Sequence, residues 1–239
     1  MDIFVWKKFY EKIIHDFGYG IKGDILSSEV LEKMIEIYKN NVASNEISKK
    51  IAGKDAYIFG AGPSLKKHVM EFKKLNDNIE KVVITADGAT KALLEENIIP
   101  DIIVSDLDGD MEYILKSNLF GSIVVVHAHG DNIDRLEKYV NNLKNIFGTT
   151  QVPKKFKNLS NYGGFTDGDR CCFLAEEFGA KQMILCGMDF GIYVTKYSRP
   201  NIEKDVEIAD SIKVKKLKYA ETLVNWLKEN GKTPIRFMG

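Results

Sequence analysis

The chain has 239 residues, enough for one substantial hydrophobic core, and its 44% hydrophobic and 28% charged residues are typical of a soluble globular protein. Its 34 basic and 34 acidic residues cancel, so the overall charge gives no reason to expect a nucleic acid or a membrane surface as partner. The 3 cysteines lack the paired spacing of a zinc site, and no apolar run approaches the roughly 20 residues of a membrane span. We therefore expect a cytoplasmic protein.

The first 52 residues have the pattern of two amphipathic helices. Aromatic and aliphatic side chains recur at helical spacing between Trp6 and Phe17, and again between Ser28 and Asn40. We predict an N-terminal helical segment over residues 1–52 and interpret it as a cap or a dimerisation arm rather than an active region. Its aromatic residues are consistent with a homodimer. The alternative is that both helices pack on the edge of the main domain.

From residue 53 on, short apolar runs alternate with amphipathic stretches. The predicted strands cover residues 56–59, 82–86, 102–105, 123–127, 183–186 and 235–238, with a weaker run at 145–149. The predicted helices cover residues 64–75, 89–97, 111–118, 131–143, 167–178 and 213–229. This repetition predicts an α/β domain over residues 53–239, with a doubly wound, mostly parallel sheet and helices on both faces. Residues 190–212 show no clear period, and a connection of that length is often a lid.

Two of the predicted strands are followed directly by aspartates. Asp87 and Gly88 come after the strand over residues 82–86, and Asp106 and Asp108 follow the next strand. The carboxyl ends of parallel strands form the edge of the sheet where ligands bind. Asp106 and Asp108 share strand parity, and at a spacing of roughly 4–5 Å and an effective dielectric of about 20 their repulsion would be on the order of 3–4 kcal/mol. A Mg²⁺ ion would remove that repulsion, so we predict a metal–phosphate site in which Asp87 and Gly88 line the nucleotide or metal side; ordinary Asp-Gly turns are the alternative.

A glycine-rich loop follows the first predicted strand of the sheet. Gly60, Gly62 and Ser64 precede a predicted helix, so the backbone can approach a ligand closely and the helix N-terminus can attract an anion. A dinucleotide-binding fingerprint would have its third glycine at position 65, where this chain has Leu65. We therefore predict that these three residues contact phosphate, with a tight turn that binds nothing as the alternative.

The fourth predicted strand ends in the sequence HAHGDN, residues 127–132. This run is similar to the HxHxDH zinc signature of metallo-β-lactamase-like hydrolases, but Asn132 stands where the last histidine is needed. We interpret Asp131 as a further carboxylate ligand of Mg²⁺. Helix capping by Asp131 is the alternative.

Two later segments place more glycine and acidic residues at the same edge of the sheet. The sequence GGFTDGDR precedes a predicted helix, and GMDFG closes the strand over residues 183–186. Glycine pairs permit close approach, carboxylates accept hydrogen bonds from a polar ring, and an arginine binds phosphate. The candidate substrate-binding residues are Gly163, Gly164, Asp167, Asp169, Arg170 and Asp189.

Taken in order, these motifs resemble the catalytic domain of thiamin pyrophosphokinases. An ADG motif at residues 86–88, a Pro-Asp segment that ends at Asp108 and a Gly-Gly segment that ends at Asp167 follow that family's order. The resemblance implies that the metal-binding acidic positions of the family fall on Asp106 and Asp108. The histidine that commonly comes next in that family is Gly168 here, which argues against thiamin as the substrate.

Over essentially the whole chain, the sequence is similar to archaeal 6-hydroxymethyl-7,8-dihydropterin pyrophosphokinases of methanopterin biosynthesis. The segments that carry this resemblance are GAGPSL, TADGA, SDLDG, HAHGDN, GGFTDGDR and GMDFG. The resemblance implies Mg²⁺-dependent transfer of a pyrophosphoryl group from ATP to the hydroxymethyl group of the pterin, with release of AMP. The residue chemistry agrees, because such a transfer needs metal-binding carboxylates and groups that hold phosphate. Asp106 and Asp108 are then the catalytic residues, and ATP and a dihydropterin alcohol are the expected partners.

Two other functions fit the same residues. The segment from Asp106 to Asp108 is also the DxD pattern of glycosyltransferases that use nucleotide sugars, some of which have a similar doubly wound domain. A non-catalytic nucleotide sensor would bind ATP at the same site and signal through the N-terminal helices.

Overall fold

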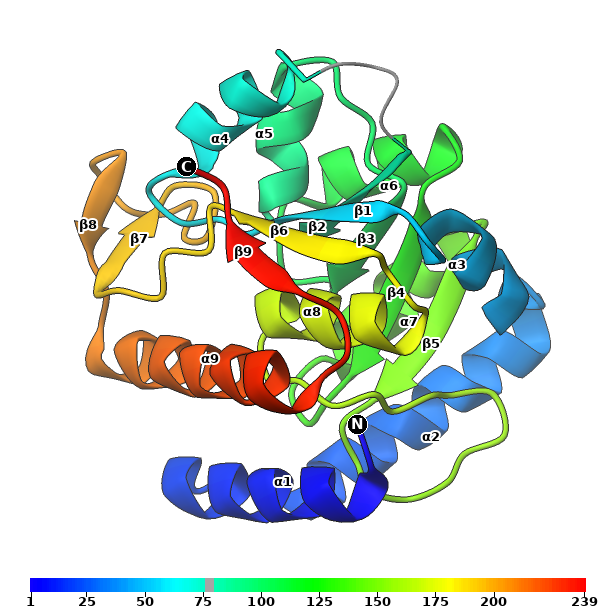
Figure 1. Cartoon of the computed structure of the whole chain (residues 1–239). Helices are drawn as coiled ribbons and strands as arrows, with labels where there is room; N and C mark the ends of the chain where they lie inside the picture. Colours follow the sequence, from blue (N-terminus) through cyan, green and yellow to red (C-terminus); the bar gives the residue numbers. More distant parts are fainter. Residues whose placement is uncertain (76–79) are drawn as a thin grey trace.

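The computed structural model describes residues 1–75 and 80–239. Its central element is a parallel sheet of 7 strands in the order β5-β4-β3-β2-β1-β6-β9 (Figure 1). The strands are β1 (Asp55–Phe59), β2 (Lys81–Ala86), β3 (Ile102–Ser105), β4 (Ile123–Ala128), β5 (Ile146–Thr150), β6 (Gln182–Cys186) and β9 (Ile235–Phe237). The predicted α/β class is confirmed, and the weak run at residues 145–149 is a strand.

The strands of this sheet, apart from the edge strand β9, are buried on both faces. Every residue of β1, β3 and β4 is buried. Parallel strands that are covered by helices on both sides have continuous apolar runs rather than alternating ones. This pattern explains why short apolar runs in the sequence locate the strands.

Helices cover both faces of the sheet. They are α1 (Ile3–Phe17), α2 (Ile21–Tyr38), α3 (Ser44–Ile51), α4 (Leu65–Phe72), α5 (Ala89–Glu95), α6 (Met111–Leu119), α7 (Ile133–Tyr139), α8 (Asp167–Glu177) and α9 (Ser211–Asn230). The helices α1, α3, α8 and α9 share one hydrophobic core, while α4 and α5, together with α2, α6 and α7, pack against the other face. The fold is therefore doubly wound, as predicted.

The N-terminal segment packs into both faces rather than standing apart. Trp6 and Tyr10 of α1 are buried in the core beneath α8 and α9, whereas Leu31 of α2 is buried beside β4 and α7. The helix α2 begins before the predicted Ser28 and contains Gly23, where an added Cβ atom would lie 3.1 Å from Cα of Gly130. Glycine is therefore needed there for close packing, although the sequence pattern suggests a loop. The helix α3 was not predicted.

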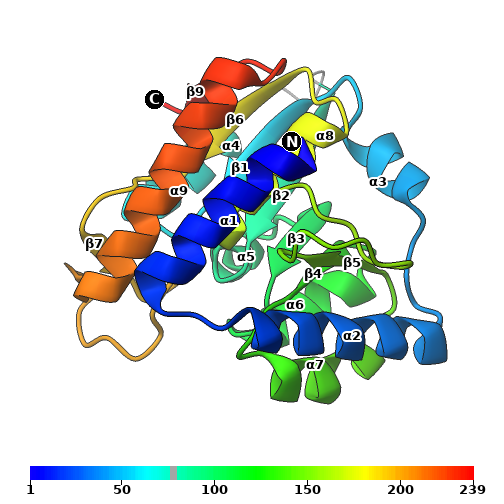
Figure 2. The same ribbon diagram turned by 90° about the horizontal axis from the view of Figure 1, so that it is seen from below.

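The helices α1 and α9 lie side by side (Figure 2). The ring centroids of Phe9 and Trp226 are 6.1 Å apart, and those of Phe17 and Tyr219 are 5.7 Å apart. The first helix of the structure is thus fixed against the last, although they are far apart in the sequence.

The long connection predicted as a lid contains a small antiparallel sheet. Its strands are β7 (Tyr193–Thr195) and β8 (Val206–Ile208). The hydroxyl of Thr195 donates a hydrogen bond of 2.8 Å to the carbonyl of Ala61, and this bond ties the segment to the loop after β1. Among the helices in residues 1–75 and 80–239, none is both long enough and apolar enough to cross a membrane.

Candidate active site

A cavity of about 840 Å³ lies at the carboxyl ends of the central strands. Its walls come from the loops after β1, β2, β3, β4 and β6, from the start of α8, from the α1–α2 turn, from residues 193–200 and from α9. The direction of strand order reverses between β1 and β6. In open α/β sheets, ligands bind in the crevice at such a switch point.

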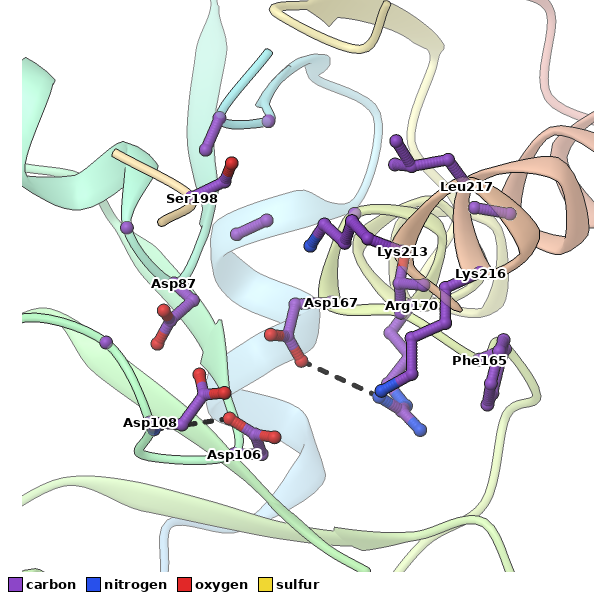
Figure 3. Close-up of a pocket in the computed structure, with 18 of the residues that line it drawn as sticks. Asp87, Asp106, Asp108, Phe165, Asp167, Arg170, Ser198, Lys213, Lys216 and Leu217 are labelled. Atoms are coloured by element: carbon purple, nitrogen blue, oxygen red, sulfur yellow. Dashed lines mark hydrogen bonds and ion pairs between the residues drawn. The ribbon is translucent and has the colours of Figure 1, made fainter. Parts of the chain in front are cut away.

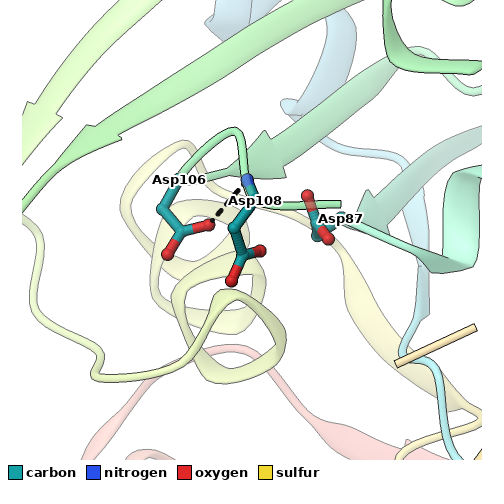
Figure 4. A group of neighbouring side chains, drawn as sticks. All are labelled: Asp87, Asp106 and Asp108. Atoms are coloured by element: carbon teal, nitrogen blue, oxygen red, sulfur yellow. Dashed lines mark hydrogen bonds between the residues drawn. The ribbon is translucent and has the colours of Figure 1, made fainter. Parts of the chain in front are cut away.

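Three aspartates meet in this cavity. Asp87 follows β2, whereas Asp106 and Asp108 follow β3. One oxygen atom from each carboxylate lies within 4.8 Å of the other two (Figure 4). The structure thus brings together both predicted catalytic aspartates and the aspartate predicted for the nucleotide or metal side.

The backbone after β3 explains this arrangement. Leu107 has a left-handed conformation, with φ of 66°, and its side chain is buried in the core, while Asp106 and Asp108 on either side of it line the cavity. The hydroxyl of Ser105 accepts a hydrogen bond from the Leu107 amide and donates one of 2.5 Å to Oδ1 of Asp87. Ser105 therefore connects the two loops that carry the carboxylates.

The three carboxylates do not ionise independently. Enclosure by the protein, together with the charge of Asp106, raises the pKa of Asp108 to about 8, although solvent in the cavity reaches this side chain. Burial and the same charge raise the pKa of Asp87 to about 6. Burial also acts to raise the pKa of Asp106, but the hydrogen bonds with His129 and Asp108 outweigh it and hold that pKa well below its usual range. A divalent cation would relieve this repulsion, and a set of carboxylate oxygens fits Mg²⁺.

Asp131 lies beside this group and is paired with a histidine. Nδ1 of His129 is 2.9 Å from Oδ1 of Asp131, and Nε2 of His129 is 2.6 Å from Oδ2 of Asp106. Burial lowers the pKa of His129, but the two carboxylates outweigh this effect and raise it to about 9. Asp131 is outside the three-aspartate group, and its side chain is 77% exposed. A metal-binding role for Asp131 therefore stays a prediction.

The glycine loop after β1 is held by the loop after β6. The amides of Gly60 and Gly62 donate to the carbonyls of Cys186 and Gly187, both at 2.8 Å. The amide of Ser64 donates to Oδ2 of Asp189 at 3.0 Å. These three amides already have partners within the protein, and a phosphate would have to displace those bonds to bind them. The predicted phosphate contact at this loop stays a prediction. Gly60, Gly62 and Asp189 still line the cavity, whereas Ser64 faces a second, smaller cavity of about 380 Å³.

The predicted substrate residues around the start of α8 fall into two groups, those that line the cavity and those that shape the turn and the helix end. The carboxylate of Asp169 accepts hydrogen bonds from the amides of Phe165 and Thr166, at 2.6 and 2.7 Å, and the side chain is fully buried. Gly163 and Gly164 each have φ of 91°, which allows the turn into the helix. Asp169 lies in the first turn of α8 and caps that helix, while the two glycines form the turn before it. None of these three residues lines the cavity.

Asp167 and Arg170 do face the cavity (Figure 3). Oδ1 of Asp167 is buried without a hydrogen bond, 3.6 Å from Nη1 of Arg170. Burial, followed by the charge of Asp106, raises the pKa of Asp167 well above its usual range. Nη2 of Arg170 donates to Oε1 of Gln151 at 3.0 Å. A buried acidic group without a hydrogen-bond partner is suited to polar groups of a ligand.

Several residues in the cavity wall were not predicted. They are Tyr19 in the α1–α2 turn, Tyr197 and Arg199 after β7, and Lys213 and Lys216 of α9. Tyr19 lies in the N-terminal segment that we expected to have no active role, and it nevertheless lines the cavity. The lysines gave no signal in the sequence, because lysines on an amphipathic helix usually face solvent.

Comparisons with known proteins identify the family of the chain. The model of the family described as 6-hydroxymethylpterin diphosphokinase MptE-like matches residues 28–195. A Methanocaldococcus jannaschii protein named 6-hydroxymethyl-7,8-dihydropterin pyrophosphokinase is 54% identical over 243 residues, which cover 100% of both chains. A Methanothermobacter thermautotrophicus protein of the same name is 45% identical and covers 98% of this chain and 99% of its own.

A solved structure shows the same fold at low sequence identity. A MAf glycosyltransferase from Magnetospirillum magneticum superposes with a TM-score of 0.51 at 13% identity, over 87% of this chain and 38% of that protein. At this identity the likeness concerns the fold alone. The family match and the two full-length relatives are more specific, and they place the chain among the diphosphotransferases. The chain belongs to the 6-hydroxymethylpterin diphosphokinase MptE-like family.

Proposed function

We propose that this protein transfers the terminal diphosphate of ATP to the hydroxymethyl group of 6-hydroxymethyl-7,8-dihydropterin, with Mg²⁺, and releases AMP. The observation that carries the proposal is the group formed by Asp87, Asp106 and Asp108 inside a cavity that also holds cationic side chains. Phosphoryl transfer depends on positioning and on neutralising the phosphate charge, and these are the groups that it requires. Membership of the family supplies the acceptor.

The reaction makes one bond and breaks one bond. The acceptor hydroxyl oxygen bonds to the β-phosphorus of ATP, while the bond from that phosphorus to the oxygen shared with the α-phosphate breaks. That oxygen leaves with AMP, and the hydroxyl proton is lost. The cation, when bound, neutralises charge on the phosphates, and the protein aligns the alcohol with the phosphorus. Asp106, Asp108 and Asp87 would hold the cation.

The other cavity residues suit the remaining parts of the two substrates. Phe165 and Asp167 offer an aromatic face and a buried acidic group, which fit a flat ring that carries hydrogen-bond donors. Gly88 and Tyr197 lie in close contact, since an added Cβ atom on Gly88 would be 1.8 Å from the Tyr197 carbonyl oxygen. The segment after β7 therefore covers the loop after β2, as expected of a lid.

The direct test is AMP release from ATP and Mg²⁺ with the dihydropterin alcohol, with thiamin and no acceptor as parallel controls. We expect AMP only with the pterin. In Asp108→Asn, release should fall about 100-fold or more, because a metal ligand is lost. Glu112→Gln is the matched control, since Glu112 is an exposed carboxylate in the first turn of α6 outside the cavity.

The same assay separates the two alternative functions. Hydrolysis of a nucleotide sugar, without AMP from ATP, would favour a glycosyltransferase. Binding of ATP without turnover of any acceptor would favour a sensor. Either result would contradict the proposed diphosphate transfer.

A further inference from the structure

Basic side chains gather on the wall of the cavity opposite the three aspartates (Figure 3). Arg170 comes from α8, whereas Lys213 and Lys216 come from consecutive turns of α9. Asp87, Asp106 and Asp108 form the facing wall. The cavity therefore has an acidic side and a basic side, an arrangement that suits an anion whose charge is shared between a cation and basic residues.

Two of the basic residues have partners in the protein. Arg170 is close to Asp167 and donates to Gln151. The ammonium group of Lys216 lies 5.9 Å from the ring centroid of Tyr19 and 6.0 Å from that of Phe165. These contacts are cation–π interactions, which stabilise the charge moderately.

Lys213 differs from them. Its side chain is partly buried and points from α9 toward the part of the cavity where Asp87 and Asp167 lie (Figure 3). Across residues 1–75 and 80–239, no ion pair or side-chain hydrogen bond of Lys213 is present. Burial, followed by the charge of Arg199, lowers the pKa of this ammonium group. A partly buried charge without an ion-pair or hydrogen-bond partner is unfavourable, and a bound anion would compensate it.

The glycine loop after β1, which the sequence predicts to bind phosphate, has no free amide donor at Gly60, Gly62 or Ser64. The amides of Gly60, Gly62 and Ser64 donate to acceptors in the loop after β6, and Oδ2 of Asp189 adds negative charge at the start of α4. An anion at this loop would have to displace those bonds and approach a carboxylate. The basic wall offers positive charge to an anion, and no hydrogen bond of the glycine loop has to be broken there.

We propose that Lys213 binds the polyphosphate of the nucleotide, with Arg170 and Lys216 beside it, so that the last long helix rather than the glycine loop supplies the main phosphate contact. The proposal deepens the proposed function, on which it rests for the identity of the nucleotide. The ligand class that it requires is a nucleoside triphosphate or another polyphosphate held together with a divalent cation. The glycine loop then serves to position the neighbouring loop after β6.

The test compares Lys213→Met, Lys213→Arg and Lys218→Met. Lys218 is on the same helix but exposed and outside the cavity, so its replacement removes the same charge without touching the site. The probes are Mg²⁺–ATP, inorganic tripolyphosphate with Mg²⁺, and adenosine, with binding measured by calorimetry. We expect Lys213→Met to weaken both polyphosphates by about 10- to 100-fold, the size of one charge-assisted hydrogen bond, and to leave adenosine unchanged.

The controls separate a phosphate contact from a structural effect. Lys213→Arg should retain most of the affinity, and Lys218→Met should bind like the unaltered protein. The proposal is overturned if Lys213→Met binds tripolyphosphate as tightly as Lys218→Met does, or if the unaltered protein binds neither polyphosphate. Loss of affinity for adenosine and polyphosphate alike, without rescue by arginine, would assign Lys213 a structural role instead.

The two proposals fail in different ways. Tripolyphosphate binding that depends on Lys213, in a protein that releases no AMP with the pterin, would sustain the phosphate contact and reject the proposed reaction. Pterin-dependent AMP release that is unchanged in Lys213→Met would sustain the proposed reaction and reject the phosphate contact.

Discussion

An added Cβ atom on Gly109 would lie 2.1 Å from Oδ2 of Asp87. The two residues belong to different strand ends, and the carboxylate of Asp87 occupies the space that a side chain at position 109 would need. The position of one aspartate of the three-aspartate group therefore depends on a glycine in the next loop.

We predict that Gly109→Ala disrupts the site without unfolding the protein. The methyl group must displace the Asp87 carboxylate or the loop itself, so Mg²⁺ affinity should fall about 10-fold or more. Calorimetry with Mg²⁺ and a thermal melt provide the measurement. Gly191→Ala is the control, because an added Cβ atom there meets its nearest neighbour, the Asp189 carbonyl oxygen, at 3.8 Å. Equal Mg²⁺ affinity in the two variants would contradict the prediction.

The affinity for Mg²⁺ should depend on pH and should be weaker at lower pH. Without the cation, the pKa of Asp108 is about 8, so this carboxyl group is mostly protonated at pH 7 and must lose its proton to bind metal. We therefore expect the release of roughly one proton per site near pH 7, and an affinity that falls as the pH decreases below 8. Calorimetry in two buffers with different ionisation enthalpies measures the proton count. A count near zero, or the same count in Asp108→Asn, would reject the assignment.

Replacement of Asp131 distinguishes a metal ligand from a partner of His129. Because Asp131 contributes to the raised pKa of His129, Asp131→Asn should lower that pKa from about 9 toward its ordinary value. An NMR titration of the histidine measures this change. If Asp131 acts only through His129, the number of bound Mg²⁺ ions stays the same. The loss of a bound ion in Asp131→Asn would establish the ligand role that the sequence predicts.

Asp24 should be important for stability. This buried residue of α2 accepts hydrogen bonds from the Tyr10 hydroxyl at 2.6 Å, from Nε2 of Gln151 at 2.8 Å and from the Gly130 amide at 2.7 Å. Asp24→Ala leaves two buried donors and the partly buried Gly130 amide without an acceptor, so we expect the free energy of unfolding to fall by about 3 kcal/mol or more. Urea unfolding measures this loss. Asp134→Ala, at an exposed position of α7, should change stability by less than about 1 kcal/mol.

Sequence reasoning works best for the parallel sheet. Its strands are continuous apolar runs that end in turn residues, and amphipathic helices separate them. The alternation of these two patterns therefore locates both the strands and the helices. The strands β7 and β8 lack this signal. Each has 3 residues, and only Val194 and Thr195 among them are buried, so no apolar run marks them.

The acidic half of the cavity could be predicted, whereas the basic half could not. Asp87, Asp106 and Asp108 follow strands directly, and the ends of neighbouring parallel strands must meet. Lys213 lies on a helix whose orientation depends on packing against α1 and α8, and the sequence does not encode this packing in any local pattern. The same limit explains why the internal bonds of the glycine loop were not foreseen, because the partners of its amides come from residues more than 120 positions away.

The place of α9 in the chain has a consequence for how the protein is made. The acidic wall is complete once the loop after β3 has been synthesised, but Lys213 comes only after β6 and the hairpin of β7 and β8. A nascent chain that has already formed most of the sheet would therefore carry the clustered carboxylates and Arg170 without the lysines of α9 that face the carboxylates. During synthesis, such a chain would contain the carboxylates that we propose to hold a divalent ion before it contains the lysine that we propose to hold the nucleotide.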